Sequence, residues 1–125
     1  MSMPIKISPA EWEVLDVLWD RAPATAAEVY HALPRDKEWH AKTVNTFLAR
    51  LVEKGVLQVR RDGRSNVYIP RKTREQCVEA EGEFFLKRVF RGAFAPMLLH
   101  FVEKADLSPG EIRELERLLR EKKKK

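Results

Sequence analysis

Paired helix-start signals recur along this chain and fix where its helices begin. In a capping box, a Ser or Thr hydroxyl and a Glu or Gln side chain three residues later satisfy backbone N–H groups that the first helical turn leaves free. This spacing occurs four times, at Ser8–Glu11, Thr25–Glu28, Thr73–Gln76 and Ser108–Glu111. The chain is therefore predicted to be mostly helical.

The first two helices are expected to lie close together in space. Apolar residues recur at helical spacing after Ser8, and Pro23 cannot continue that helix. The second helix carries Val29 and Leu33 on its apolar side and stops at Pro34. Because the link between them is only three to four residues long, the pair is typical of a helix-turn-helix.

A third helix is predicted from about Ala41 to Lys54. It has a core stripe at Val44, Phe47, Leu48, Leu51 and Val52. Its opposite side consists mainly of groups that can hydrogen-bond to bases or phosphates: Lys42, Thr43, Asn45, Thr46, Ala49, Arg50 and Glu53. Gly55 supplies the left-handed residue that ends such a helix.

A short hairpin follows this helix. Residues 57–61 and 65–69 alternate like strands around Asp62-Gly63, which is a strong hairpin-turn signal. Arg60, Arg61 and Arg64 lie at or beside its tip. Three helices followed by a basic hairpin are typical of a winged helix, in which the third helix enters the major groove of DNA.

The distribution of charge supports double-stranded DNA as a partner. Residues 40–74 hold nine basic and two acidic side chains, a balance of +7, whereas the whole chain carries +5. Such concentration is the electrostatic footprint of a surface that meets a polyanion, although a solvated basic face is the simpler alternative. A winged helix that binds another protein instead of DNA, or one with an architectural role, stays open as a further alternative.

The chain beyond Pro70 is predicted to form helices and no strands. The interpretation divides the chain into a winged helix-turn-helix domain (1–70), a helical dimerisation segment (71–121) and a basic disordered tail (122–125). Because the last helices are too apolar to stand alone in water, a homodimer is expected. The dimerisation residues are Phe85, Val89, Phe90, Leu98, Leu99, Phe101, Val102, Leu115 and Leu118.

Other classes of function find little support in the sequence. His31, His40 and His100 lie in unrelated segments, and no catalytic motif accompanies them, so neither an enzyme nor a metal or cofactor site is predicted. The single cysteine, Cys77, is expected to pack as a small apolar residue. No apolar run approaches the length of a membrane span, so membrane insertion is not expected and the protein is placed in the cytoplasm.

Three segments resemble the BlaI/MecI family of bacterial penicillinase repressors, which is related to the CopY-type copper regulators. They read IS-x-AEWEVLDVLW, KTVNTFLARLVEKG and LLHFVEK-x-DLS. The resemblance implies a dimeric repressor on a palindromic operator. It places DNA contacts on Lys42, Thr43, Asn45, Thr46, Arg50, Arg60, Arg61 and Arg64. The sequence departs from the family at His40, where Ser or Thr is common, and at Asn45.

The resemblance also suggests how repression ends. In the penicillinase repressors a membrane metalloprotease partner triggers cleavage of an Asn-Phe bond, and the aligned bond here is His100-Phe101. Cleavage there and simple packing of both side chains at the dimer interface are equally open, as is control by a small ligand. The copper branch binds metal through clustered C-terminal cysteines, which this chain lacks, so copper sensing by that route is not expected.

Overall fold

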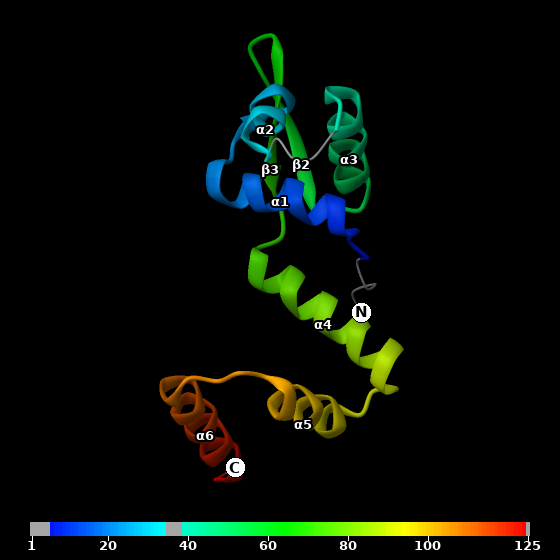
Figure 1. Ribbon diagram of the computed structural model, residues 1–125. Coiled ribbons are helices and arrows are strands. Elements are labelled where there is room, and N and C mark those ends of the chain that lie inside the picture. Colours follow the sequence, from blue (N-terminus) through cyan, green and yellow to red (C-terminus); the bar gives the residue numbers. More distant parts are fainter. Residues whose placement is uncertain (1–5, 35–38, 125) are drawn as a thin grey trace. The chain divides into compact units, whose positions relative to one another are not determined.

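The computed structural model describes residues 6–34 and 39–124, and within them helices predominate (Figure 1). The elements are α1 (Pro9–Arg21), β1 (Ala24–Thr25), α2 (Ala26–Ala32), α3 (Ala41–Glu53), β2 (Leu57–Asp62), β3 (Ser65–Pro70), α4 (Arg74–Phe90), α5 (Phe94–Lys104) and α6 (Pro109–Lys123). This mostly helical fold with a small hairpin confirms the predicted fold class.

All four predicted helix starts are present. In α1, the Ser8 N–H donates to Glu11 Oε1 (2.8 Å) and the Glu11 N–H donates to Ser8 Oγ (3.1 Å). The same reciprocal pairs occur at Thr25–Glu28, Thr73–Gln76 and Ser108–Glu111. Local side-chain chemistry therefore sets the first residues of α1, α2, α4 and α6.

The chain divides into two compact units, Met1–Phe84 and Phe85–Lys125. The core of the first unit holds fully buried side chains from α1, α2, α3 and the start of β2, among them Leu15, Leu18, Val29 and Leu48. Cys77 of α4 is 3% exposed and belongs to this core, and burial raises the pKa of its thiol. The first unit therefore extends beyond the predicted boundary at Pro70, because the start of α4 packs with it.

The sheet has one strand more than the sequence predicts. Its order is β1-β3-β2, all antiparallel, with Ala24 opposite Tyr68 and Arg61 opposite Asn66. β1 contains only two residues, too few to show an alternating pattern, and its pairing depends on β3 far along the chain. The hairpin of β2 and β3 extends beyond the helices of this unit (Figure 1).

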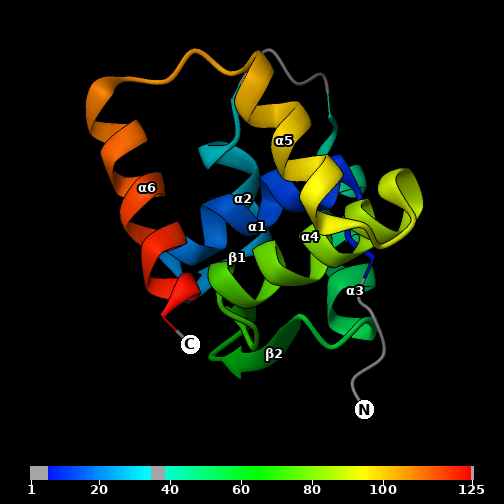
Figure 2. The same cartoon turned by 90° about the horizontal axis from the view of Figure 1, so that it is seen from below.

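The second unit contains the end of α4 with α5 and α6, the last two joined by an extended segment (Figure 2). Neither α5 nor α6 has a buried residue. α6 continues through Lys122 and Lys123, which the sequence places in a disordered tail. Basic side chains favour the last turn of a helix because the C-terminal end of its dipole is negative. Lys125 lies outside the described residues.

Candidate nucleic-acid interface

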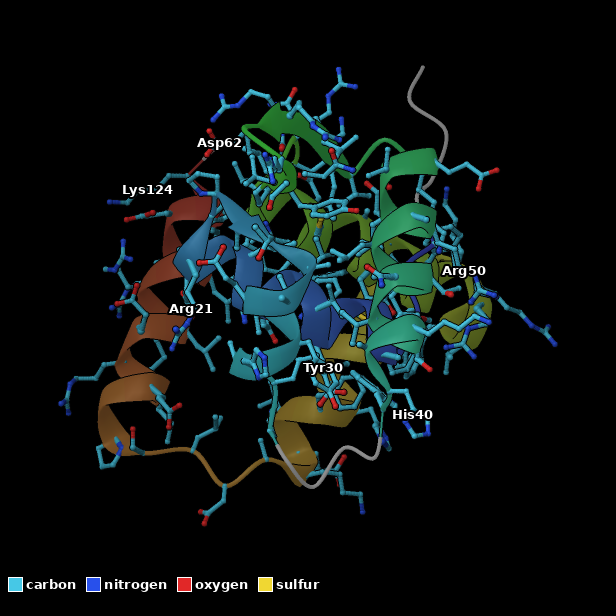
Figure 3. The ribbon with its side chains drawn as sticks, turned by 90° about the horizontal axis from the view of Figure 1, so that it is seen from above. Arg21, Tyr30, His40, Arg50, Asp62 and Lys124 are labelled. Atoms are coloured by element: carbon cyan, nitrogen blue, oxygen red, sulfur yellow. The ribbon has the colours of Figure 1, made fainter. Side chains whose placement is uncertain are left out.

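α3 presents one apolar and one polar side. Val44, Leu48 and Leu51 are fully buried against the core. The opposite side carries Lys42, Asn45, Thr46, Ala49 and Arg50, all exposed, whereas Thr43 is half-buried. Because each residue advances the helix by about 100°, the buried stripe turns the predicted contact residues outward. Figure 3 shows Arg50 on the outer side of α3.

Both ends of α3 are anchored to the first unit. Trp39, just before the helix, packs against the hydrophobic core and edge-on against Phe47 of the helix itself, with 5.2 Å between ring centroids. At the other end, Lys54 Nζ donates to Glu11 Oε1 (2.6 Å) and to the Lys6 carbonyl (2.7 Å). Anchoring at two points fixes the axis of the helix, which a side chain that reads bases requires.

The ion pair at the end of α3 is absent from the sequence-based prediction. Glu11 is 1% exposed and is the buried charged residue of this core. Burial by itself would raise the pKa of Glu11, but hydrogen bonds from Lys54 and from Ser8, together with the charge of Lys54, outweigh burial and lower it. Glu11 is therefore a buried carboxylate held by the cation at the C-terminal cap of α3.

Two polar side chains of α3 differ in what they can still bind. The exposed Thr46 hydroxyl donates to the Lys42 carbonyl (3.1 Å), so its proton is engaged within the helix and its oxygen can only accept a further hydrogen bond. Asn45 is exposed, and its amide can both donate and accept. Asn45 is accordingly the better equipped of the two for hydrogen bonding to a base edge.

The start of α3 lacks a side-chain cap. His40 occupies the N-cap position with extended backbone (φ −80°, ψ 158°), but its side chain makes no capping hydrogen bond. The first turn also contains no acidic residue. This end of α3 differs from the starts of α1 and α2, where capping boxes occupy the N–H groups.

The β2–β3 hairpin, here called the wing, carries three exposed arginines. Arg60, Arg61 and Arg64 surround a turn in which Gly63 has φ 65°, a conformation that favours glycine. Arg61 Nε donates to the Gly63 carbonyl (3.1 Å) and so braces the tip. All eight predicted contact residues therefore lie in the first unit, five on α3 and three on the wing.

The predicted dimerisation residues lie in the second unit. Phe85, Phe90 and Phe101 form a cluster with ring centroids 5.8 to 6.2 Å apart. Leu99 is 68% exposed, and Phe101 and Val102 are also exposed. Leu98, Val102, Leu115 and Leu118 help to line an apolar groove of about 350 Å³ between α5 and α6. His100 and Phe101 lie inside α5, with their rings edge-on at 5.4 Å.

The described residues contain neither a metal-binding cluster nor a membrane-spanning helix. Within residues 6–34 and 39–124, no three His, Cys, Asp or Glu side chains gather in a way that could hold a metal ion. No helix in the same residues combines the length and apolarity needed to cross a bilayer.

Comparison with known proteins places this geometry in context. The profile of the family described as "Penicillinase repressor" matches residues 7–121. The methicillin resistance regulatory protein MecI of Staphylococcus aureus strain N315 is 33% identical over 117 residues, which cover 94% of this chain and 95% of MecI. The penicillinase repressor of Bacillus licheniformis is 37% identical over 118 residues, covering 94% of this chain and 92% of that protein.

A solved structure shows the same similarity. The solution structure of monomeric Bacillus licheniformis BlaI in complex with the blaP half-operator is 36% identical, with a TM-score of 0.52. The match covers 61% of this chain and 93% of the BlaI chain.

Proposed function

Because this chain belongs to the penicillinase repressor family, we propose that it is a sequence-specific DNA-binding transcriptional repressor. One observation carries the proposal: α3, held to the core before its start by Trp39 and at its end by Lys54, turns a polar side outward in the same unit as an arginine-bearing wing. The similarity to BlaI, which was solved on a half-operator, supports the same assignment. As a repressor of bacterial genes it would act in the cytoplasm.

We assign the contact residues to two roles. Lys42, Arg50 and the wing arginines would bind phosphates, since long cationic side chains suit the backbone and carry little sequence information. Thr43, Asn45 and Thr46 would approach base edges in the major groove, since short polar side chains on a recognition helix reach them. Because Thr43 is half-buried, it should contribute less to base recognition than Asn45 or Thr46.

We further propose that two copies bind a palindromic operator as a homodimer. The support is the second unit, many of whose large apolar side chains stay more than 40% exposed within the described residues. The exposed residues of this kind include Val89, Phe94, Leu99, Phe101, Val102, Ile112, Leu118 and Leu119. Burying such side chains against a second copy stabilises by about 25 cal/mol per Å² of apolar surface.

The deciding experiment is selection of bound sequences from a random duplex library by the purified chain, with the footprint measured. The proposal expects a palindromic consensus with half-sites about one helical turn apart. Enrichment of no sequence, or of DNA without any sequence preference, would contradict it and favour the alternatives, a winged helix that binds a protein partner or one with an architectural role.

Release from the operator is proposed to follow cleavage between His100 and Phe101, triggered by a membrane protease. Both residues lie within α5, so the helix must open locally before a protease can bind the bond in extended form. Intact-mass measurement after co-expression with the candidate protease tests this step. A cut at that bond supports it, whereas derepression of the full-length chain would contradict it and favour ligand control.

A further inference from the structure

The strand register of the wing fixes which of its side chains share a face. Arg61 lies directly opposite Asn66, and Arg60 lies opposite Val67. Side chains alternate between the two faces along a strand, and residues directly opposite each other in an antiparallel pair lie on the same face. Arg61 and Asn66 therefore share one face of the wing, while Arg60 lies on the other.

Burial identifies the face that carries Arg61 and Asn66. Leu57 lies four residues before Arg61 on β2, and Tyr68 lies two residues after Asn66 on β3, so both belong to this face. Leu57 is 1% exposed in the core of the first unit, and Tyr68 packs against that core. Val67, on the other face, is also buried but does not belong to that core. The tip of the wing extends beyond the helices (Figure 1), and there Arg61 and Asn66 are exposed.

At the tip, this face brings together a cation and an amide. Arg61 Nε donates to the Gly63 carbonyl (3.1 Å), which leaves its two Nη groups to bind a phosphate. The Asn66 side chain forms no hydrogen bond within residues 6–34 and 39–124, and its amide can both donate and accept. The Cβ atoms of directly opposite residues lie about 5 Å apart. A phosphate contact by Arg61 would therefore bring Asn66 to the same stretch of duplex.

An amide at the tip of such a hairpin is suited to the minor groove. That groove is only about 6 Å wide, so side chains can enter it but a two-stranded hairpin cannot. A·T pairs present only acceptors there, N3 of adenine and O2 of thymine, whereas a G·C pair adds the N2 amino donor of guanine. The N–H groups of an Asn amide can donate to either acceptor. A-tract DNA also has a narrow minor groove whose negative potential attracts a cation such as Arg61.

We propose that Asn66 is a specificity-determining residue of the wing, which selects A·T over G·C in the minor groove beside each half-site. This inference rests on the proposed function, sequence-specific binding to an operator. Arg61 holds the wing on the backbone, and the Asn66 amide donates to N3 of adenine or O2 of thymine. Because A·T and T·A present the same acceptors in this groove, Asn66 does not distinguish between them.

The test measures the affinity of the full chain for duplexes that carry the library-selected operator. The base pairs flanking each half-site are changed one position at a time to A·T, T·A, G·C or I·C. Inosine lacks the N2 amino group of guanine, so an I·C pair resembles A·T in the minor groove and G·C in the major groove. The test variant is Asn66→Ala. Gln58→Ala, which removes an exposed amide from the other face of the wing, is the matched control.

The expected result is a preference at one flanking position that depends on Asn66. Wild type and Gln58→Ala should bind A·T, T·A and I·C equally within about twofold there, and G·C about five- to tenfold more weakly, near the lower end for a mismatched base pair. The Asn66→Ala chain should bind all four duplexes within about twofold of one another, because the amide that reads the pair is gone. Its base preferences inside the half-site should stay those of wild type.

Several outcomes would overturn the inference while the selected half-site, and with it the proposed function, remains. These are a wild-type chain without a flanking preference, and an Asn66→Ala chain that still rejects G·C. Binding of I·C as weakly as G·C by wild type would place the readout in the major groove. An equal loss on every duplex would mean that Asn66 contributes to affinity or folding alone. A library selection that returns no preferred sequence would overturn the proposed function, and the inference would fall with it.

Discussion

At the scale of single residues, the outward side of α3 separates affinity from sequence preference. Arg50→Ala should weaken binding by a similar factor on all duplexes, because a phosphate contact carries no base information. Asn45→Ala should instead cost about 1 to 3 kcal/mol on the preferred sequence and relax the preference at one base pair. Binding to the selected operator and to single-base variants measures both. Equal losses on all DNA for Asn45→Ala would refute this division of roles.

The Glu11–Lys54 ion pair makes stability depend on pH. Because the folded-state pKa of Glu11 is lowered, the pair's contribution is present above the ordinary glutamate pKa of about 4.3 and is lost as pH falls below it through the folded-state pKa. Denaturant unfolding between pH 7 and pH 3 should show this decline. In Glu11→Gln, that part of the decline should be missing, and an unchanged pH profile would contradict the assignment.

Removing the cation of the same pair should lower the free energy of unfolding more than Glu11→Gln does. Lys54→Met leaves the Glu11 carboxylate buried without its partner, which should cost about 3 kcal/mol, near the lower end for a broken buried pair since Lys54 is partly exposed. Lys42→Met, on the exposed side of α3, is the matched control and should change unfolding by less than about 0.5 kcal/mol. Similar losses in the two variants would contradict a structural role for Lys54.

The sequence could predict which side of α3 is polar but not this pair. Apolar residues at helical spacing predict which side of a helix is buried, because the period of the helix is fixed. Glu11 and Lys54 lie 43 positions apart and meet only through tertiary packing. Glu11 was recognisable as a capping residue, and nothing local indicated that the same carboxylate would be buried under the end of α3.

At the scale of elements, the uncapped start of α3 leaves room for stabilisation. His40→Ser should raise the free energy of unfolding by about 1 kcal/mol, because a Ser hydroxyl can accept from a first-turn N–H group where His40 makes no such bond. His40→Ala is the control and should be nearly neutral for folding. Chemical denaturation of the three chains decides the matter, and a His40→Ser chain no more stable than His40→Ala would contradict the expectation.

Elements whose signals are local were predictable, and elements that depend on distant partners were not. The starts of α1, α2, α4 and α6 follow from capping side chains within four residues. The wing follows from Asp62-Gly63 between alternating runs. β1 exists because Ala24 and Thr25 pair with β3. α6 continues through Lys123, into the segment predicted as a disordered tail, because basic side chains are favourable in the last turn of a helix.

At the scale of the whole molecule, the division at Phe84 predicts where the chain can be cut. A chain of residues 1–84 should fold, remain monomeric and bind a single half-site, while losing about 10² to 10⁴ in affinity for the palindrome. A chain of residues 1–71 should be less stable by about 2 kcal/mol, because it also loses the burial of Cys77. Analytical ultracentrifugation and denaturation test both. Equal stability of the two chains would contradict the place of Cys77 in the core.

Salt dependence tests the interface as a whole, because it counts neutralised phosphates. Five cations of the first unit, Lys42, Arg50, Arg60, Arg61 and Arg64, are exposed on α3 and the wing. If each neutralises one phosphate in both copies, the log–log slope of affinity against salt should be about −9 for the dimer on its palindrome. Residues 1–84 on a half-site should give about half that value.

The ratio of these two slopes also shows whether the second unit contacts DNA. α6 ends in basic residues, Arg120, Lys122 and Lys123 among them. If those residues met DNA as well, the full chain would show a slope well beyond twice that of residues 1–84, whereas an interface confined to α3 and the wing keeps the ratio near two. A slope shallower than about −4 for the full dimer would contradict the electrostatic basis of the interface altogether.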